Sequence, residues 1–492
     1  MTEPSEPEFD HLIVGAGTAG CVLAARLSED ACVRVGLIEA GPPDRSLLLA
    51  MPAGLRSLFR PGNRYNWWFN TTPQAGLDQR RVHQPRGKTL GGSSSINGMS
   101  WLRGHPDDYN ECAALGCPDW SFEKCLPTFK ALERCPHGDP AFRGRNGPVG
   151  VSRVEALSPL NAAFLDAGRQ AGLPATDAPN GAKTQGFCRF DMSVAHGLRS
   201  SASRAYLRAA LTRPNLTVAT GERVRRLVVE NGQATGVELD GRILRARSII
   251  LAAGAFGSPH LLMLSGIGPA NHLRQNGIGV LADVPSVGAN LSDHLEVHVQ
   301  VRTEQPVGLN RELQLHRAAS AGLEWLIFKR GPAATAGCHV GAFLRSAEAH
   351  DHRPDIQFHF FPLYFGADWV PKPGVHGYRL GAGPTRPESR GTVRLASADP
   401  SAAPLIDPAY LTTERDIRQA REGLKLARDT LRQSAFARFG GQEDTPGSGV
   451  STDLDLDAYI RANAASAYHP CGTCRLGQGA AAVVASAFRV RG

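Results

Sequence analysis

The chain opens with an apolar stretch at residues 9–14, followed by a glycine-rich turn at residues 15–20. Residues 21–27 are rich in Ala and Leu and predict a helix. The valine-rich alternation of residues 32–38 predicts a second strand. Strand, helix and strand in this order are typical of the start of a doubly wound parallel sheet.

Further alternation along the chain predicts strands at residues 216–219, 224–230, 234–239, 248–252, 297–301 and 356–361. The dipeptide Asn231-Gly232 lies between two of them and predicts a hairpin turn. Residues 413–434 have the periodicity of a helix, whereas residues 442–452 are polar and Gly-rich and are expected to form a surface loop.

Composition and charge are compatible with many classes of globular protein. The 492 residues are 20% charged and 42% hydrophobic, which is ordinary for a globular protein with more than one folding unit. The net charge is +8 and the pI about 9.1, but Lys and Arg are spread along the chain. A scattered positive surface is therefore favoured over a nucleic-acid-binding module, which would rest on the pI alone.

Targeting signals are not evident in the sequence. Residues 1–10 are acidic and lack a basic and apolar leader, which argues against a secretory signal. No apolar run reaches the length of a transmembrane helix, so no integral membrane segment is expected. The ten cysteines form no dense framework, and we expect reduced thiols in a cytoplasmic protein.

The first motif with chemical content is the turn Gly15-Ala16-Gly17-Thr18-Ala19-Gly20, which matches G-x-G-x-x-G between a strand and a helix. Gly15 permits the tight turn, Gly17 lets the backbone approach a pyrophosphate, and Gly20 allows close packing of helix and strand. Glu39 ends the second predicted strand and can accept hydrogen bonds from an adenosine ribose. This combination predicts dinucleotide binding but does not separate FAD from NAD.

Two later segments are also rich in glycine. Residues 85–99 contain Gly91-Gly92, then three serines and Asn97, and such a backbone can lie against a planar or anionic ligand. A Gly/Ser linker is disfavoured there because apolar residues interrupt the run. Residues 254–268 follow a predicted strand, and Ser258-Pro259 is expected to start a helix there, since Pro suits the first helical position.

These two segments resemble the paired signature motifs of the glucose–methanol–choline (GMC) oxidoreductases, in the style of the choline dehydrogenase group. Further matches occur in the family's order at residues 65–68, 290–294, 354–360 and 468–477. The resemblance implies FAD as cofactor and the oxidation of an alcohol. It also implies an α/β fold, with a doubly wound, Rossmann-like FAD-binding domain and a discontinuous α+β substrate-binding domain. The first is expected at residues 1–155, 199–300 and 463–492, and the second at residues 156–198 and 301–462.

The resemblance also assigns roles to particular residues. The ADP half of FAD is expected on Gly15, Gly17, Thr18, Ala19, Gly20, Glu39 and Ala40, with Val224, Ala253 and Gly254 near the adenine and ribose. The pyrophosphate and flavin are expected on Arg86, Gly91, Gly92, Ser93, Asn97, Gly98 and Met99. Some relatives bind flavin covalently through a histidine in the second segment. Ile96 stands at that place here, so non-covalent FAD is expected.

His469 is the expected catalytic residue. The reaction removes a hydroxyl proton and transfers a hydride to flavin N5, so the protein must supply a base that titrates near neutral pH. A single histidine among 16 would otherwise be structural or exposed, but the sequence Tyr468-His469-Pro470 matches the family's catalytic histidine. Cys471 and Cys474 follow closely, and because no second ligand pair has suitable spacing, packing cysteines are favoured over a zinc or redox site.

The end of the chain departs from the family pattern. Relatives are expected to continue beyond residue 492 with a strand of the FAD sheet, an acidic residue, and a second catalytic histidine or asparagine. We therefore expect a truncated chain with weakened FAD binding and little turnover, because an unpaired buried strand would cost roughly 1–3 kcal/mol for each unsatisfied group.

Alternatives to an active flavoenzyme are an inactive family member that keeps only the fold, and a nicotinamide-dependent dehydrogenase. The two later glycine segments argue against the second. The sequence does not identify the alcohol, although Glu296, Glu312 and Trp325 are available for an ammonium group. It leaves the electron acceptor open between oxygen, a quinone and other compounds, and it leaves the oligomeric state open.

Overall fold

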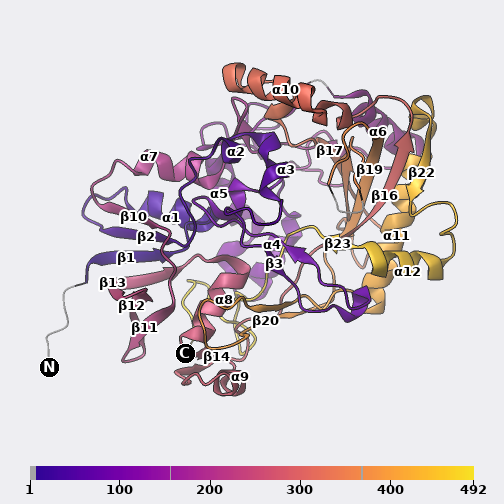
Figure 1. Cartoon of the computed structure of the whole chain (residues 1–492). Coiled ribbons are helices and arrows are strands. Elements are labelled where there is room, and N and C mark those ends of the chain that lie inside the picture. The colour runs from indigo at the N-terminus through magenta and orange to yellow at the C-terminus, as the bar shows by residue number, and fades with distance from the viewer. Residues whose placement is uncertain (1–6, 156, 367–369, 492) are drawn as a thin grey trace.

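Two β-sheets, each covered by helices, form the two lobes of the molecule in the computed structural model (Figure 1). The structure describes residues 7–155, 157–366 and 370–491. One sheet contains the first strand of the chain, and the other is built mainly from residues beyond 295. The chain crosses between the lobes several times, so that segments distant in sequence meet at their boundary.

The first sheet has six strands in the order β10-β2-β1-β13-β12-β11. Its parallel part confirms the predicted doubly wound arrangement, with β1 paired to β2 on one side and to β13 on the other. A hairpin through Asn231-Gly232 joins β11 to β12, as predicted, with both turn residues at positive φ. The strands are β1 (Phe9–Val14), β2 (Val35–Glu39), β10 (Leu216–Thr220), β11 (Arg226–Glu230), β12 (Gln233–Leu239) and β13 (Arg242–Leu251).

Both faces of the parallel strands are buried. On one face, Ile13 and Leu37 pack against helix α1 (Thr18–Leu27) and the segment around Tyr206. On the other, Leu12 and Val14 pack against α8 (Gly254–Leu264) and Val483. This two-sided burial explains the unbroken apolar runs at residues 12–14 of β1 and residues 35–38 of β2. Helix α1 begins at Thr18, three residues before the predicted start, because the turn residues themselves form its first turn.

The predicted start of the later helix is wrong. Helix α8 begins at Gly254, and Pro259 lies inside it instead of at its first position. A proline at this place has no N–H to donate to the carbonyl of Ala255. The hydroxyl of Thr473 donates to that carbonyl at 2.6 Å, so a distant segment supplies the hydrogen bond that the proline removes.

The second sheet is antiparallel, in the order β22-β16-β19-β18-β17-β7, with β23 also paired to β16. Alternate residues of β16 divide between its two faces: Val297, Val299 and Val301 join a large core, whereas Glu296 and His298 face the other way toward a cavity. The strands are β7 (Gly186–Arg189), β16 (Leu295–Thr303), β17 (Val340–Leu344), β18 (Ile356–Phe361), β19 (His376–Pro384), β22 (Gly441–Thr445) and β23 (Ala465–Ser466).

Three helices cover the core side of this sheet: α6 (Pro159–Gln170), α11 (Glu414–Leu431) and α12 (Asp453–Asn463). Helix α11 confirms the predicted helical segment, and its Ala420, Leu424 and Ala427 recur at the spacing of one buried face. The predicted loop at residues 442–452 is partly wrong, since β22 extends the sheet there by pairing with β16.

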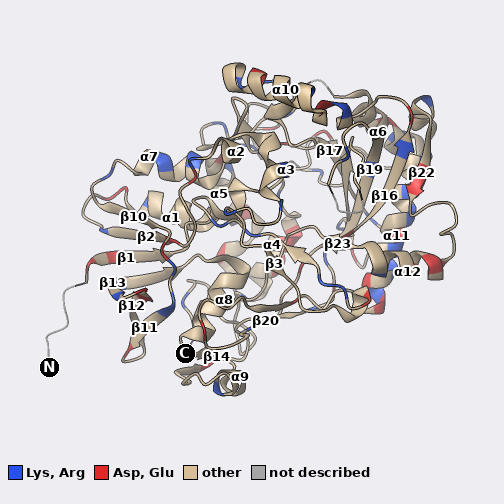
Figure 2. Cartoon of the chain, in the orientation of Figure 1, with Lys and Arg blue, Asp and Glu red and all other residues tan. Residues whose placement is uncertain are grey.

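Shorter elements complete the lobes. The remaining helices are α2 (Leu47–Ala50), α3 (Leu55–Leu58), α4 (Pro106–Ala114), α5 (Phe122–Leu132), α7 (Arg208–Ala210), α9 (Ala270–Gln275) and α10 (Leu315–Phe328). Within the described residues, no helix is long and apolar enough to cross a membrane. Charged side chains are scattered over both lobes (Figure 2). The predicted domain boundary at residue 300 falls inside β16, and the domain limits remain a prediction.

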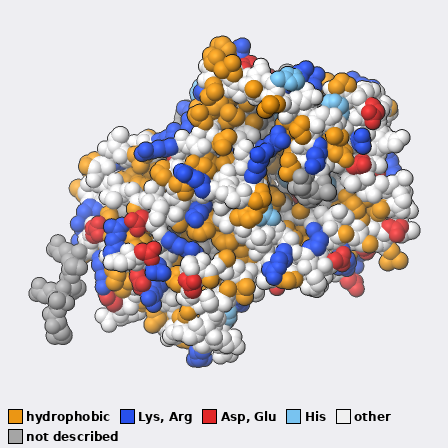
Figure 3. All heavy atoms as spheres, in the orientation of Figure 1, with side chains coloured by type: hydrophobic (Ala, Val, Ile, Leu, Met, Phe, Trp, Pro, Cys, Tyr) orange, Lys and Arg blue, Asp and Glu red, His pale blue; other side chains and the backbone are white. Residues whose placement is uncertain are grey.

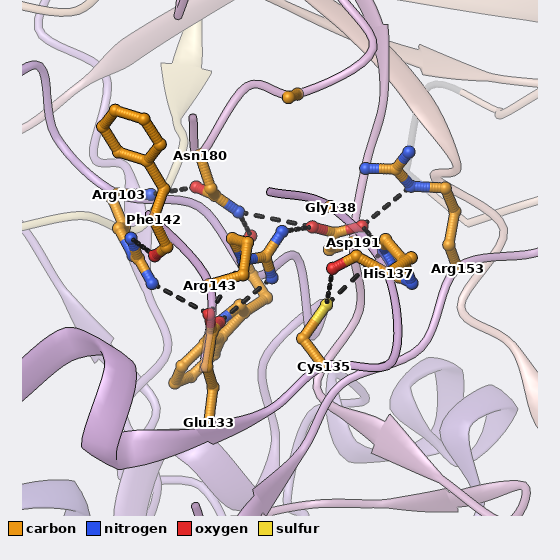
Figure 4. A network of polar contacts seen from close by, with 12 residues as sticks. Arg103, Glu133, Cys135, His137, Gly138, Phe142, Arg143, Arg153, Asn180 and Asp191 are labelled. Carbon is orange, nitrogen blue, oxygen red and sulfur yellow. Dashed lines mark hydrogen bonds and ion pairs between the residues drawn. The ribbon is translucent and has the colours of Figure 1, made fainter. Parts of the chain in front are cut away.

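A buried ion-pair network ties residues 133–153 to residues 180–191 (Figure 4). Arg143 Nη1 lies 2.5 Å from Asp191 Oδ2, and Arg143 Nε lies 2.8 Å from Glu133 Oε1. Arg153 Nε binds the other oxygen of Asp191 at 2.8 Å. Cys135 and His137 stand close enough to share a metal ion with Asp191, but two guanidinium groups already neutralise this carboxylate. The network therefore serves as a structural clamp.

We expect Asp191→Asn to lower the free energy of unfolding by about 3 kcal/mol, because it removes the buried charge that Arg143 and Arg153 share, and Arg143 then keeps only Glu133. Urea unfolding followed by circular dichroism measures this change. The control is Glu29→Gln, since Glu29 pairs with Arg26 at side-chain exposures of 51% and 53% and its loss should cost less than about 1 kcal/mol. Equal shifts for the two variants would contradict the assignment.

Candidate active site

The predicted nucleotide turn lies at the carboxyl edge of the parallel strands. Gly15 has φ +97°, and a Cβ there would lie 2.7 Å from the carbonyl oxygen of Ala252. Thr18 and Ala19 are exposed at the start of α1, which has neither an acidic residue in its first turn nor a side-chain cap. The free N–H groups and positive dipole end of this helix suit a pyrophosphate.

The second glycine segment packs directly on the first. The N–H of Gly91 donates to the carbonyl of Ala16 at 2.8 Å. A Cβ on Gly92, which has φ +51°, would come within 2.6 Å of the Cα of Gly17. The structure thus brings together two predicted cofactor segments whose backbones touch because neither carries a side chain at the contact.

Glu39 stands at the end of β2, as predicted, and is buried. Its Oε2 accepts from the N–H of Ala16 at 3.0 Å and its Oε1 from the N–H of Gly41 at 2.8 Å. Burial raises the pKa of Glu39 to about 7, against the lowering effect of the two backbone donors. The carboxylate therefore also shapes the glycine turn, while its remaining lone pairs can still accept from a ribose hydroxyl.

The other predicted cofactor residues divide between two places. Ala253 and Gly254 follow β13 at the same sheet edge as Ala40, and Val224 is buried in the core beside β12. Ser93 Oγ accepts from the N–H of Gly87 at 3.2 Å and so stiffens the second segment. Arg86 does not point freely into a pyrophosphate site, because its Nη2 donates to the carbonyl of Tyr468 at 2.8 Å.

A large cavity of about 1720 Å³ separates the two lobes. Of the predicted site residues, Asn97, Gly98, Met99 and His469 line it, whereas the first glycine turn does not. Arg199, almost fully buried, donates to the side-chain oxygen of Asn97 at 2.9 Å and holds it at the cavity edge. The site therefore consists of a sheet edge for a nucleotide and a cavity for a larger planar group and a substrate.

His469 is held by its backbone. Its N–H donates to Asp293 Oδ1 at 2.8 Å. The other oxygen of this buried carboxylate accepts from Ser466 Oγ at 2.6 Å, from Gln84 Nε2 at 2.9 Å and from the hydroxyl of Tyr410. The carboxylate thereby fixes the position of the histidine, and the imidazole remains exposed to the cavity.

A second histidine, which sequence reasoning did not select, contacts His469. His294 Nδ1 lies 3.1 Å from His469 Nδ1, and the two rings are nearly perpendicular at 88°. His294 Nε2 lies 2.8 Å from the carbonyl oxygen of Thr385. The protein that surrounds the cavity partly desolvates the His469 ring, and together with the nearby His294 this lowers the pKa of His469 to about 4. His469 is therefore neutral at physiological pH and able to accept a proton.

Further titratable groups face the cavity from the second sheet. His359 Nδ1 forms a short hydrogen bond with Glu296 Oε1, and His298 Nε2 lies 3.6 Å from Glu296 Oε2. Although burial opposes ionisation, His359 and His298 hold the pKa of Glu296 well below its ordinary value. The sequence signal that could have found these residues is the spacing of two between His294, Glu296 and His298, because every second residue of a strand lies on the same face.

The remaining candidates lie apart from this group. Glu312 lines the cavity, whereas Trp325 is fully buried. Cys471 lines the cavity and Cys474 packs in the core of the first lobe.

Comparisons with known proteins agree with this arrangement. Two GMC oxidoreductase family models, of the N- and C-terminal domains, match residues 9–296 and 387–492. The chain is 44% identical to the oxygen-dependent choline dehydrogenase of Photobacterium profundum, over 95% of this chain and 84% of that protein. It is also 44% identical to the mitochondrial choline dehydrogenase of Mus musculus, over 96% of this chain and 81% of that protein.

Solved structures show the same fold. Pyridoxine 4-oxidase from Mesorbium loti has a TM-score of 0.88 and 34% identity, covering 98% of this chain and 92% of that one. A formate oxidase variant from Aspergillus oryzae RIB40 has a TM-score of 0.91 and 26% identity, covering 98% and 91%. The chain belongs to the GMC oxidoreductase family, and the predicted class is confirmed: it is an FAD-dependent oxidoreductase that acts on an alcohol.

The expectation of a truncated, impaired chain is corrected by these findings. The family's C-terminal domain is present at residues 387–492. In the structure, Val483 and Val484 are buried in the core of the first lobe, and β1 has a partner strand on both sides. The segment after His469 therefore folds back onto this lobe and contributes to its core.

Proposed function

We propose that the cavity binds a small alcohol beside FAD and that His469 Nε2 removes the hydroxyl proton. The observation that carries this proposal is the hydrogen-bond chain from Thr385 through His294 to His469. A carbonyl oxygen only accepts, so His294 Nε2 must carry the proton that bonds to Thr385. Neutral His294 then has a lone pair on Nδ1, to which His469 Nδ1–H donates. His469 Nε2 is left unprotonated, which is the form that a base requires.

The role of His294 in this proposal is to position its partner. It selects the tautomer of His469 and holds the ring, as a hydrogen-bonded carboxylate does for other histidine bases. When His469 accepts the substrate proton, Nδ1–H remains bonded to His294 and the new charge is shared along the chain. Glu296, with its pKa well below the ordinary value, is a nearby counter-charge. Bound FAD supplies the hydride acceptor.

The residues present suit FAD held without a covalent bond. The uncapped start of α1 and the touching Gly17 and Gly92 form a backbone surface for the pyrophosphate, and the cavity edge at Asn97–Met99 can face the flavin. Ile96 is buried against Leu49 and Leu58 and offers no nucleophile. All ten cysteines are free, which suits the reducing cytoplasm that we propose as the protein's location.

We propose choline as the substrate for two reasons: the relatives are choline dehydrogenases, and the carboxylate of Glu296 faces the cavity. An ionised, buried carboxylate in a cavity is a counter-ion for a quaternary ammonium group. Against the effect of burial, Glu296 raises the pKa of His359, so this pair is already partly neutralised. An ammonium group would therefore compete with His359 for the carboxylate.

The cofactor arrangement is tested by Gly92→Ala. A positive φ and a new contact with Gly17 together cost roughly 1–3 kcal/mol, so FAD binding should weaken about tenfold or more. The flavin released by acid precipitation of the purified protein measures occupancy. All flavin should appear in the supernatant for the native chain, and yellow precipitate would contradict non-covalent binding. Gly279→Ala is the control, because a Cβ there meets nothing within 4 Å.

The base is tested by pH profiles. His469→Gln should lower kcat by roughly 10²–10⁴-fold. In the native enzyme kcat/KM should fall as the pH drops through about 4, because only neutral His469 accepts a proton. His294→Leu removes a neighbour that lowers this pKa, so the acid limb should move up toward the ordinary value of 6.5, with partial rescue by His294→Gln. A reduced kcat with an unchanged profile would contradict the proposed positioning.

The substrate is tested by Glu296→Gln with choline and with its neutral carbon analogue, 3,3-dimethyl-1-butanol. Loss of a buried charge partner costs about 2–5 kcal/mol, so kcat/KM for choline should fall by roughly 30-fold or more. The neutral alcohol should be affected far less. Glu312→Gln is the control, since Glu312 also lines the cavity but is paired with Arg311 at 2.8 Å. Equal losses for both alcohols would contradict an ammonium substrate.

A further inference from the structure

Helix α10 (Leu315–Phe328) exposes apolar side chains that have no partner in the described structure. Leu315 is 87% exposed, Leu323 58%, Ile327 61% and Phe328 59%. Figure 3 shows hydrophobic side chains on the surface at the top of the view, where Figure 1 places α10. Large apolar residues gathered on one element are unusual on a surface and mark an interaction site.

The orientation of the helix follows from a single anchor. Trp325 is the buried residue of α10, and its Nε1 donates to the carbonyl of Gly197 at 2.7 Å. With 3.6 residues per turn, Leu315, Leu323 and Ile327 fall within an arc of roughly 120°. Leu323 and Ile327 lie roughly 160° from Trp325, and Leu315 lies at the edge of this arc, roughly 80° from Trp325. The helix is therefore amphipathic with its apolar face turned outward, the reverse of an ordinary surface helix.

Basic residues flank this face. Arg311 and Arg317 lie toward its start, with side-chain exposures of 51% and 46%, and Lys329 and Arg330 follow its end. Glu312 pairs with Arg311 and Arg317, and Glu324 pairs with Arg330. Four basic and two acidic residues leave residues 311–330 with a net charge of +2. Arg330 also stacks on the ring of Phe328 at 5.0 Å, so cationic and apolar groups adjoin at this end.

We propose that α10 docks the enzyme on an anionic lipid surface. A helix lying in a bilayer interface inserts one apolar face while its basic residues meet acidic headgroups. The cytoplasmic leaflet has the required negative surface charge. A second copy of the chain fits less well, because a twofold contact through this face would bring the same basic residues together.

Docking would also place the cavity close to the membrane. Ala318, Ala321 and Gly322, on the inner side of α10, line the cavity, so this helix separates it from whatever covers the outer face. The inference does not depend on the alcohol that is oxidised or on the base, and it can fail or succeed independently of the proposed function.

The test is co-sedimentation of the FAD-loaded enzyme with vesicles of phosphatidylcholine, with and without phosphatidylglycerol. Binding is expected to the anionic vesicles and to weaken at high salt. The double variant Leu323→Glu/Ile327→Glu should reduce the bound fraction by roughly tenfold, since it puts carboxylates into the apolar face. The control is Leu454→Glu, at a residue of α12 that is 82% exposed and far from α10 in sequence.

Several results would overturn the proposal. One is that the enzyme sediments with neither kind of vesicle, and another is that the double variant binds anionic vesicles as well as the native enzyme does. Loss of vesicle binding by the Leu454→Glu control would contradict the proposal in the same way. A change from dimer to monomer in the double variant, measured by light scattering, would assign the face to a second copy instead. Flavin content and circular dichroism verify folding, and Arg317→Glu/Arg330→Glu should independently weaken the preference for anionic vesicles.

Discussion

The buried carboxylate of Asp293 is the constraint on which the active site depends. It accepts hydrogen bonds from Gln84, Tyr410 and Ser466 and from the backbone of His469. These partners come from three separate segments, around residues 84, 410 and 466–469. A charge buried this deeply is stable only when its hydrogen bonds are satisfied. Correct packing of both lobes is therefore a condition for His469, the base that we propose, to reach its place.

The two sheets present polar groups in different ways. The parallel sheet is buried on both faces, so its polar groups can meet a ligand only at the edge where the strands end and glycine turns let backbones touch. The antiparallel sheet has a core on one face only, and its other face can present Glu296, His298 and His359 to the cavity. In the function that we propose, the backbone therefore contributes most of the cofactor contacts, whereas side chains contribute the substrate chemistry.

Local patterns predicted much of this arrangement. Strand β1 and the hairpin at Asn231-Gly232 follow from short-range signals that tertiary contacts do not oppose. The errors occurred where a distant segment changed the local outcome. Helix α8 tolerates Pro259 because Thr473 bonds the carbonyl of Ala255, and β22 forms because the edge of β16 is available. The contact between His294 and His469 also had no local signal, because the two residues lie far apart in the sequence.

By itself the sequence determined the glycine turns, the strand and helix periods, the family and the choice of His469, because these depend on residue types at fixed spacing. Tertiary structure alone decided that His294 Nδ1 meets His469 Nδ1, that His294 Nε2 meets the carbonyl of Thr385, and that α10 exposes large apolar side chains. These are relations between groups far apart in the chain, and hydrogen-bond direction and exposure exist only once the backbone has brought them together.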